Sequence, residues 1–186
     1  MRDDEIISLY FERDEKALAE TEEKYGAYCR AVAENILRNS EDVEECINSA
    51  WLGAWNAIPP NTPKNLKIFL AKITRNIALN KLKAKTAEKR GGDESCAILD
   101  ELSECISSGE SIEEGFVAKE LGESINRFAA RLPKRERNIF IRRYFFMETA
   151  ETIGERYALS ANNVAVILHR IRKKLKNHLE KEGYTP

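Results

Sequence analysis

The sequence has little that could build a metal site, a disulfide framework or a membrane anchor. Its four cysteines include no C-x-x-C pair, and its two histidines lie far from them along the chain. Zinc sites and disulfide scaffolds need closer spacing, so we expect reduced thiols and neither a metal nor a cofactor. No apolar run approaches the ~20 residues of a membrane span, and the acidic start MRDDEIISLYFERDE lacks the parts of a signal peptide. We therefore expect no membrane insertion and a cytoplasmic location.

Residues that break helices are also scarce, with 9 Gly and 5 Pro in 186 residues. Almost every segment repeats its apolar residues with the helical period, and none alternates as a strand would. The pattern predicts helices over residues 3–12, 14–39, 40–58, 64–90, 111–130, 133–146, 148–157 and 160–181. Ser40 and Ser160 stand where the N-caps of two of them are expected. The expected fold class is all-α.

The net charge of −1 conceals separate blocks of charge. Residues 67–90 are basic, residues 91–123 are acidic, and the chain after Arg131 is basic again. Two basic blocks with an acidic stretch between them indicate two surfaces for a polyanion. We expect two small helical domains, residues 1–90 and 115–186, joined by an acidic flexible linker over 91–114. Such a linker lacks a core and should be mobile, although its few apolar residues, Ile98 among them, leave docking on a domain open.

The helix predicted over 40–58 carries an unusual outer face. Its core-facing side is expected to hold Val43, Ile47, Ala50, Trp51, Ala54 and Ile58. Its outer side places Leu52 and Trp55 beside carboxylates, and exposed aromatic residues with a polar rim are typical of partner-binding sites. The candidate partner surface consists of Glu44, Glu45, Asn48, Ser49, Leu52 and Trp55. The alternative is that Trp55 only covers the edge of the core.

The next helix, over 64–90, has the composition of a nucleic-acid face. Its expected buried stripe is Leu66, Phe69, Leu70, Ile73, Ile77 and Ala84. A second stripe combines cations for phosphates, amides for base edges and a leucine for an unstacked base: Lys72, Arg75, Asn76, Leu79, Asn80 and Lys83. The proline-stiffened loop before it adds the polar candidates Asn61, Thr62, Lys64 and Asn65, unless it is a plain connector.

The run ETAETIGERYALSANNVAVILHRIRKKLKNHL near the C-terminus has the form of a helix-turn-helix. A short first helix, a turn at Ala158–Ser160 and a long basic second helix follow one another. The second helix is expected to bury Val164, Leu168, Ile171, Leu175 and Leu179. Its DNA-facing candidates are Ser160, Asn162, Asn163, Val166, Ile167, Arg170 and Lys173. Asparagine suits adenine in the major groove, and the later cations suit phosphates.

With these segments described, the sequence resembles the extracytoplasmic-function class of bacterial RNA polymerase sigma factors. EDVEECINSAWLGAW (41–55) is similar to the family's core-binding helix, and FLAKITRNIALNKLK (69–83) to its promoter-melting helix. Residues 132–175 resemble its C-terminal region, although Ala165, Val166 and Ile167 replace the usual Lys-Ser-Arg and leave the minus-thirty-five preference open. Asn48 and Ser49 likewise replace the usual Gln-Glu of the core-binding helix.

The resemblance implies a transcription initiation factor without catalytic residues. It would bind core RNA polymerase through the partner surface and read and melt the minus-ten element with the loop and the helix after it. The helix-turn-helix would read the minus-thirty-five element, and the acidic linker, with Asp93, Glu94, Asp100, Glu101 and Glu104, would suit a cationic polymerase channel. It also implies an anti-sigma factor of unknown identity.

Two other functions are weighed against this one. A stand-alone helix-turn-helix regulator, acting on duplex DNA without polymerase, accounts for residues 132–180 but gives the two earlier surfaces no role. An enzyme is disfavoured because the sequence has no Gly-rich phosphate loop, no metal-ligand spacing and no Ser/His/Asp set.

Overall fold

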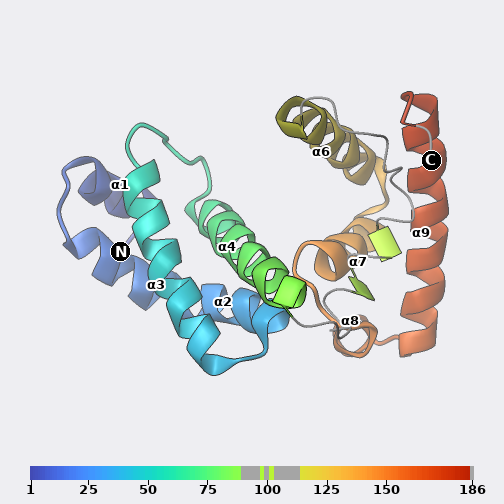
Figure 1. Ribbon diagram of the computed structural model, residues 1–186, viewed down its shortest axis with the longest axis horizontal. Coiled ribbons are helices and arrows are strands. Elements are labelled where there is room, and N and C mark those ends of the chain that lie inside the picture. The colour runs from blue at the N-terminus through green and yellow to red at the C-terminus, as the bar shows by residue number, and fades with distance from the viewer. Residues whose placement is uncertain (89–96, 99–100, 103–113, 185–186) are drawn as a thin grey trace. The chain divides into compact units, whose positions relative to one another are not determined.

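The computed structural model describes residues 1–88, 97–98, 101–102 and 114–184, with the side chains of 86–88 and 114–119 left out. The chain forms two compact units, Met1–Gly91 and Gly92–Pro186 (Figure 1). All regular elements assigned in the described residues are helices: α1 (Asp3–Phe11), α2 (Lys16–Leu37), α3 (Ser40–Ala57), α4 (Leu66–Glu88), α6 (Glu114–Arg131), α7 (Lys134–Tyr144), α8 (Ala150–Tyr157) and α9 (Ala161–Lys181). The all-α prediction is confirmed for the described residues, and each of the eight predicted helices has a counterpart there. Among the helices described, none is long and apolar enough to cross a bilayer.

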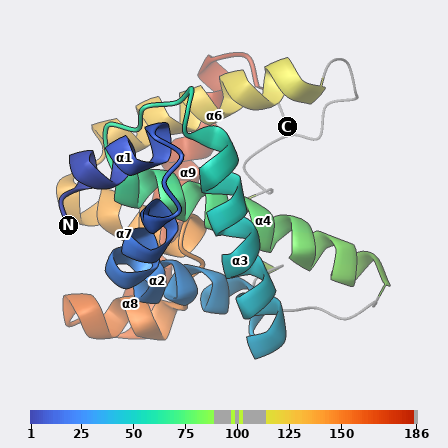
Figure 2. The ribbon, with the colours of Figure 1, turned by 90° about the vertical axis from the view of Figure 1, so that its left-hand side faces the viewer.

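In the first unit, α2, α3 and α4 pack against one another, and α1 lies on α2 (Figures 1 and 2). The six residues expected on the core side of α3 are all buried, from Val43 to Ile58. Trp51 donates its indole N–H to Glu22 Oε2 of α2 at 2.5 Å, which satisfies the one polar atom of a large buried side chain. The core face of α3 was therefore predicted correctly.

The buried face of α4 differs from its prediction. Leu66 and Leu70 are buried as expected, but the stripe continues through Ala71, Thr74, Ala78 and Leu82. Phe69, Ile73 and Ile77 are half-buried, and Ala84 is exposed. Thr74 lies in the core because its hydroxyl donates to the Leu70 carbonyl at 2.9 Å, so the burial of a polar residue leaves no donor unpaired.

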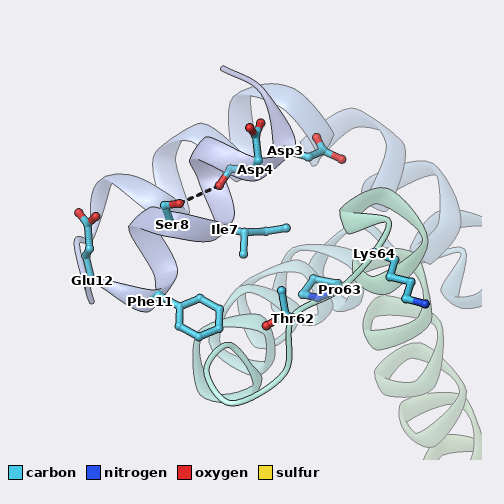
Figure 3. Close-up of a pocket in the computed structure, with 9 residues that line it drawn as sticks. All are labelled: Asp3, Asp4, Ile7, Ser8, Phe11, Glu12, Thr62, Pro63 and Lys64. Atoms are coloured by element: carbon cyan, nitrogen blue, oxygen red, sulfur yellow. Dashed lines mark hydrogen bonds between the residues drawn. The ribbon is translucent and has the colours of Figure 1, made fainter.

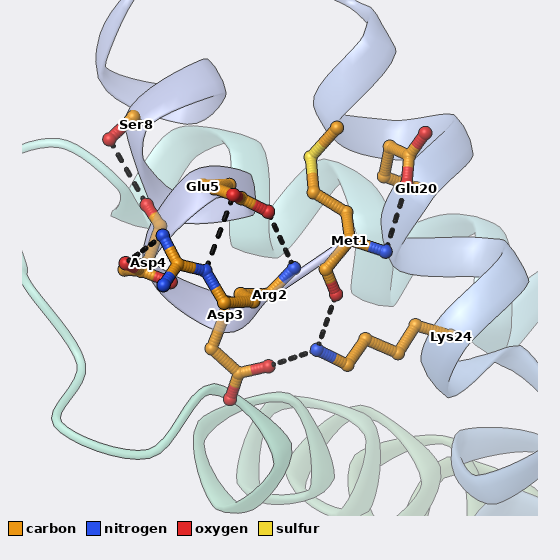
Figure 4. A network of polar contacts seen from close by, with 8 residues as sticks. All are labelled: Met1, Arg2, Asp3, Asp4, Glu5, Ser8, Glu20 and Lys24. Carbon is orange, nitrogen blue, oxygen red and sulfur yellow. Dashed lines mark hydrogen bonds and ion pairs between the residues drawn. The ribbon is translucent and has the colours of Figure 1, made fainter.

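A polar network holds the first residues of α1 on α2 (Figure 4). Lys24 donates to the Met1 carbonyl and to Asp3 Oδ1, both at 2.7 Å, and Glu5 Oε2 accepts the backbone N–H of Arg2 at 2.8 Å. Tyr25 also donates to Asp3, at 2.5 Å. The hydrogen bonds from Lys24 and Tyr25 hold the pKa of Asp3 below its usual value. The acidic first turn of α1 also complements the positive end of its helix dipole.

The start of α3 is capped one residue earlier than expected. Asn39, not Ser40, is the N-cap, and its side chain accepts the backbone N–H of Asp42 at 3.1 Å. The buried Asp42 carboxylate forms ion pairs with Lys85 and with Lys81 of α4. This cluster joins the N-terminal turn of α3 to the C-terminal half of α4.

In the second unit, α9 packs against α6, α7 and α8. The five residues expected on its inner face are buried, from Val164 to Leu179, and Ser160 is its N-cap, accepting the Asn163 N–H at 3.2 Å. The helix-turn-helix is therefore confirmed, with α8, the turn at 158–160 and α9 in place. The turn passes so close to α8 that a Cβ on Gly154 would lie 2.5 Å from the carbonyl oxygen of Leu159.

Part of the expected linker lies on this second unit. Ile98 is 1% exposed, which confirms that an apolar residue of the linker docks. The Glu101 carboxylate forms ion pairs with Arg143 of α7 and Arg172 of α9, so this acid of the expected linker is held by the second unit. The expected linker residues Asp93, Glu94, Asp100 and Glu104 lie outside the described residues.

Candidate nucleic-acid interface

The outer face of α3 presents the partner surface largely as the sequence predicted. Leu52 has 61% of its surface exposed, an unusual degree for a large apolar residue in the middle of a helix. Glu44, Glu45 and Asn48 are exposed, while Ser49 and Trp55 are half-buried. The six candidate residues therefore lie along one side of α3, with Leu52 as the most exposed apolar side chain.

Trp55 packs against residues that the sequence reasoning did not connect with it. Its ring lies 6.1 Å from the ring of Tyr10, and the Arg13 guanidinium lies 5.3 Å from its ring centroid. Arg13 also donates to the Trp55 carbonyl at 2.6 Å. Trp55 thus covers the edge of the core, as the alternative had it, while part of its side chain stays exposed; its role in partner binding stays a prediction. Arg13 is 42 residues away in sequence, and no local pattern could have found the contact.

Two carboxylates of the partner surface already have cations nearby. Glu44 pairs with Arg30 of α2, and Glu45 pairs with Lys81 of α4. The side chains of both acids remain mostly exposed, and exposed ion pairs contribute little to stability. Both carboxylates therefore remain accessible to an incoming partner at low energetic cost.

The predicted nucleic-acid stripe of α4 is on the surface. Lys72, Asn76, Asn80 and Lys83 are exposed, and Arg75 and Leu79 are half-buried. Partial burial lowers the pKa of Arg75, as expected for a charged group with reduced hydration. These side chains combine phosphate-binding cations with amides along one helix face.

Ile68 extends this stripe and was missed by the sequence reasoning. It precedes Lys72 by four residues and so lies one helical turn earlier on the same face. Its side chain is 61% exposed, as much as that of Leu52. The i, i+4 spacing was the signal that could have revealed it.

The loop before α4 uses some of its candidate residues to hold its own shape. Asn61 donates from its side chain to the Ala57 carbonyl at 2.8 Å, and Asn65 Oδ1 accepts the Ile68 N–H at 3.0 Å. Asn65 therefore caps the first turn of α4. Asn76 follows Asn65 by eleven residues, a rise of about 16 Å along the helix. Asn65 and Asn76 therefore lie too far apart along the helix to line one pocket.

The loop instead faces α1 across an open groove of about 730 Å³ (Figure 3). Ile7 and Phe11 of α1 lie on one side, and Thr62, Pro63 and Lys64 on the other. The remaining lining side chains are Asp3, Asp4, Ser8 and Glu12. Asp3, Asp4 and Glu12 make the lining acidic, which disfavours the binding of a phosphate inside the groove itself.

The residues of the helix-turn-helix that are expected to face DNA lie at its surface. Ser160, Asn162, Asn163, Val166, Arg170 and Lys173 are exposed, and Ile167 is half-buried. Val166 is 42% exposed between amide and cationic side chains, which places an apolar contact in the middle of a polar face. This face can meet base edges, thymine methyl groups and phosphates. In the part of the chain that the structure describes, no group of His, Cys, Asp and Glu could hold a metal ion.

Comparison with known families matches both units. The family model described as Sigma-70 region 2 matches residues 23–88, which include α3, the loop and α4. The model described as Sigma-70 region 4 matches residues 129–177, which include the helix-turn-helix. No match was found among curated proteins. The two matched stretches follow in order and together cover more than half of the chain, and on this ground the protein belongs to the sigma-70 family of transcription initiation factors.

Proposed function

We propose that this protein is a sigma factor of the extracytoplasmic-function class. It binds core RNA polymerase, reads and melts a minus-ten element with the first unit, and reads a minus-thirty-five element with the second. Its small size supports this class, because regions 2 and 4 with a short connection account for most of the 186 residues.

The observation that carries the proposal is that one chain combines two exposed helix faces rich in cations and amides, on α4 and α9, with an exposed apolar residue on α3. The α4 stripe and the α9 face supply cations and amides at both surfaces. The exposed Leu52 on α3 gives the chain a docking residue that DNA does not need.

We assign each surface a separate role. The six residues from Glu44 to Trp55 bind polymerase. The α4 stripe tracks the melted strand, and Thr62 and Lys64 of the loop influence which minus-ten base is preferred. Asn162 and Asn163 read bases in the minus-thirty-five element, and Arg170 and Lys173 hold phosphates.

Transcription with purified core polymerase on fragmented genomic DNA, followed by sequencing of the transcripts, tests the proposal. We expect defined new start sites that depend on the added protein, with a shared sequence about 10 and 35 base pairs upstream. Loss of these start sites with a folded Leu52→Glu variant, whose duplex binding is unchanged, would assign the polymerase role to α3. Specific duplex binding without any new start site would contradict the proposal and support the stand-alone regulator.

The stand-alone regulator is the weaker alternative, because it leaves residues 23–88, which match Sigma-70 region 2, without a role. An anti-sigma factor is an expected partner of the class, and it stays a prediction for this chain.

A further inference from the structure

Three side chains of the second unit converge on the carboxylate of Glu101. Arg143 donates to Oε1 at 2.6 Å, while Arg172 and Tyr144 donate to Oε2 at 2.9 and 3.2 Å. Ile98, three residues earlier, is 1% exposed. A short stretch of the linker is therefore attached to the second unit by one apolar and one charged side chain.

The site around this carboxylate is built into the domain. Arg143 is only 9% exposed and also donates to the backbone carbonyl of Glu148 at 3.1 Å, which fixes its orientation. Burial raises the pKa of Tyr144 to about 12, so its hydroxyl keeps the proton that it donates. Arg172 also donates to the Tyr144 oxygen at 2.9 Å.

The two guanidinium groups explain why the ligand has to be an anion. Arg143 and Arg172 both lie within hydrogen-bonding distance of one carboxylate, and both are largely buried. Like charges brought together at low dielectric repel each other unless an anion lies between them. A carboxylate accepts from both, one at each oxygen.

We propose that Arg143, Arg172 and Tyr144 form a carboxylate-binding site whose ligand in the isolated protein is Glu101, and that this contact is a latch that polymerase binding opens. The binding site itself follows from the contacts above. The opening step rests on the proposed function, because it requires that the linker be used by polymerase.

The reach of the chain supports the opening step. With Ile98 and Glu101 docked, residues 89–96 alone connect Glu88 to Ala97, a span of at most about 32 Å. Released, residues 89–113 could span about 90 Å between Glu88 and Glu114. Promoter elements 25 base pairs apart lie about 85 Å apart along the duplex. The docked linker covers less than half of that distance, so the two folded units would have to span the remainder, whereas the released linker covers all of it.

The Glu101 carboxylate cannot bind Arg143 and Arg172 and at the same time bind a cationic surface of polymerase. Both oxygens of Glu101 are occupied in the docked state, so the same group is not available to a cationic surface of polymerase. Docking and use by polymerase are therefore alternatives. The fraction of protein in the docked state reduces the apparent rate and affinity of assembly.

Glu101→Gln in the full chain tests both the carboxylate-binding site and the opening of the latch, since it removes the negative charge and retains the size of the side chain. The control is Glu123→Gln, which neutralises an exposed carboxylate of α6. A second variant, Ile98→Ser, weakens the apolar half of the contact. Hydrogen exchange in the isolated proteins is read from the peptide that contains residues 97–102. We expect exchange at least tenfold faster in Glu101→Gln and Ile98→Ser than in the wild type and the control. Equal exchange in all four proteins would overturn the binding site.

Association with core polymerase is then followed by stopped-flow mixing. We expect Glu101→Gln to associate roughly three to ten times faster than the wild type, with the control unchanged. An unchanged or slower rate would overturn the latch, even if the exchange data support the site. If no variant and no wild-type protein binds polymerase, the proposed function fails together with the opening step, while the exchange data still decide the carboxylate site.

Discussion

Among single residues, Gly154 is subject to the tightest steric limit in the helix-turn-helix. Its missing side chain leaves room for the Leu159 carbonyl, which would be 2.5 Å from a Cβ. We expect Gly154→Ala to lower the free energy of unfolding by about 1–3 kcal/mol, because backbone rather than a flexible side chain has to move. Urea unfolding followed by circular dichroism measures this.

Gly122 is the matched control for that substitution. It also lies in a helix, α6, but nothing is within 4 Å of a Cβ added there. Gly122→Ala should therefore raise stability by about 0.5–1 kcal/mol through helix propensity alone. Similar effects of the two substitutions would show that the turn does not press on α8.

Asn163 and Arg170 should give different kinds of loss in minus-thirty-five binding. Arg170→Ala should weaken binding to all sequences alike and reduce the slope of log K against log salt by about one. Asn163→Ala should relax the preference at one base position, by about 1–3 kcal/mol of discrimination. Binding of a set of duplexes with single base changes, at several salt concentrations, separates the two. The opposite assignment of effects would mean that α9 meets the groove with another face.

At the scale of the helices, the first prediction concerns the binding of core polymerase by α3. Leu52→Ala should weaken core binding by ~1 kcal/mol or more, and Trp55→Ala by ~2 kcal/mol or more, as buried anchors do at interfaces. Ile68→Ala is the control, since Ile68 is equally exposed but lies on α4. Binding of labelled protein to core polymerase measures the change. Trp55→Ala also removes the contacts to Tyr10 and Arg13, so its stability has to be compared in parallel.

The contact between α3 and α4 should weaken in acid. The hydrogen bond from Lys85, together with the charge of Lys81, holds the pKa of Asp42 below its usual value of 3.8. The ionised carboxylate therefore contributes stability above pH 3.8, and this contribution is lost as the pH falls through the lowered pKa. We expect Asp42→Asn to be less stable than the wild type at pH 6 and the difference to shrink below pH 4. A difference that does not vary with pH would exclude the charge as its cause.

The same two helices show how far the sequence predicts packing. The apolar pattern of α3 predicted its buried face, because every buried residue of this helix except Asp42 is apolar or aromatic. On α4 the pattern favoured Phe69, Ile73 and Ile77, whereas Thr74 and small alanines occupy the core. A polarity pattern cannot foresee a hydroxyl whose hydrogen bond is made within its own helix.

For the molecule as a whole, the linker acids outside the latch carry a further prediction. Replacing Asp93, Glu94, Asp100 and Glu104 with Ser and Asn, while Glu101 is kept, removes four negative charges. If the linker lies in a channel built for a negatively charged transcript, the ratio of short abortive to full-length transcripts should change, and holoenzyme assembly should weaken. Duplex binding by the second unit should stay the same. An unchanged ratio and unchanged assembly would make the linker a passive connection.

The candidate sites also differ in how far the sequence alone predicts them. Surfaces formed by one helix, such as the α9 face and the α4 stripe, could be read from the sequence because helical spacing alone defines them. Sites that join distant segments could not. The partners of Glu101 lie 42 and 71 residues further along the chain, and the groove opposite the loop depends on α1, which the sequence reasoning left without a role.

The protein's two tryptophans, Trp51 and Trp55, both lie in α3. Trp51 is buried and donates to Glu22, while Trp55 is half-buried beneath Arg13. Fluorescence excited at 295 nm therefore comes from this one helix, and the second unit is silent at that wavelength. A partner that covers the outer face of α3 would exclude water from around Trp55 and shift its emission to shorter wavelengths. DNA bound only by α9 would leave the emission spectrum unchanged. The unmodified chain thus contains its own optical probe for the docking of polymerase.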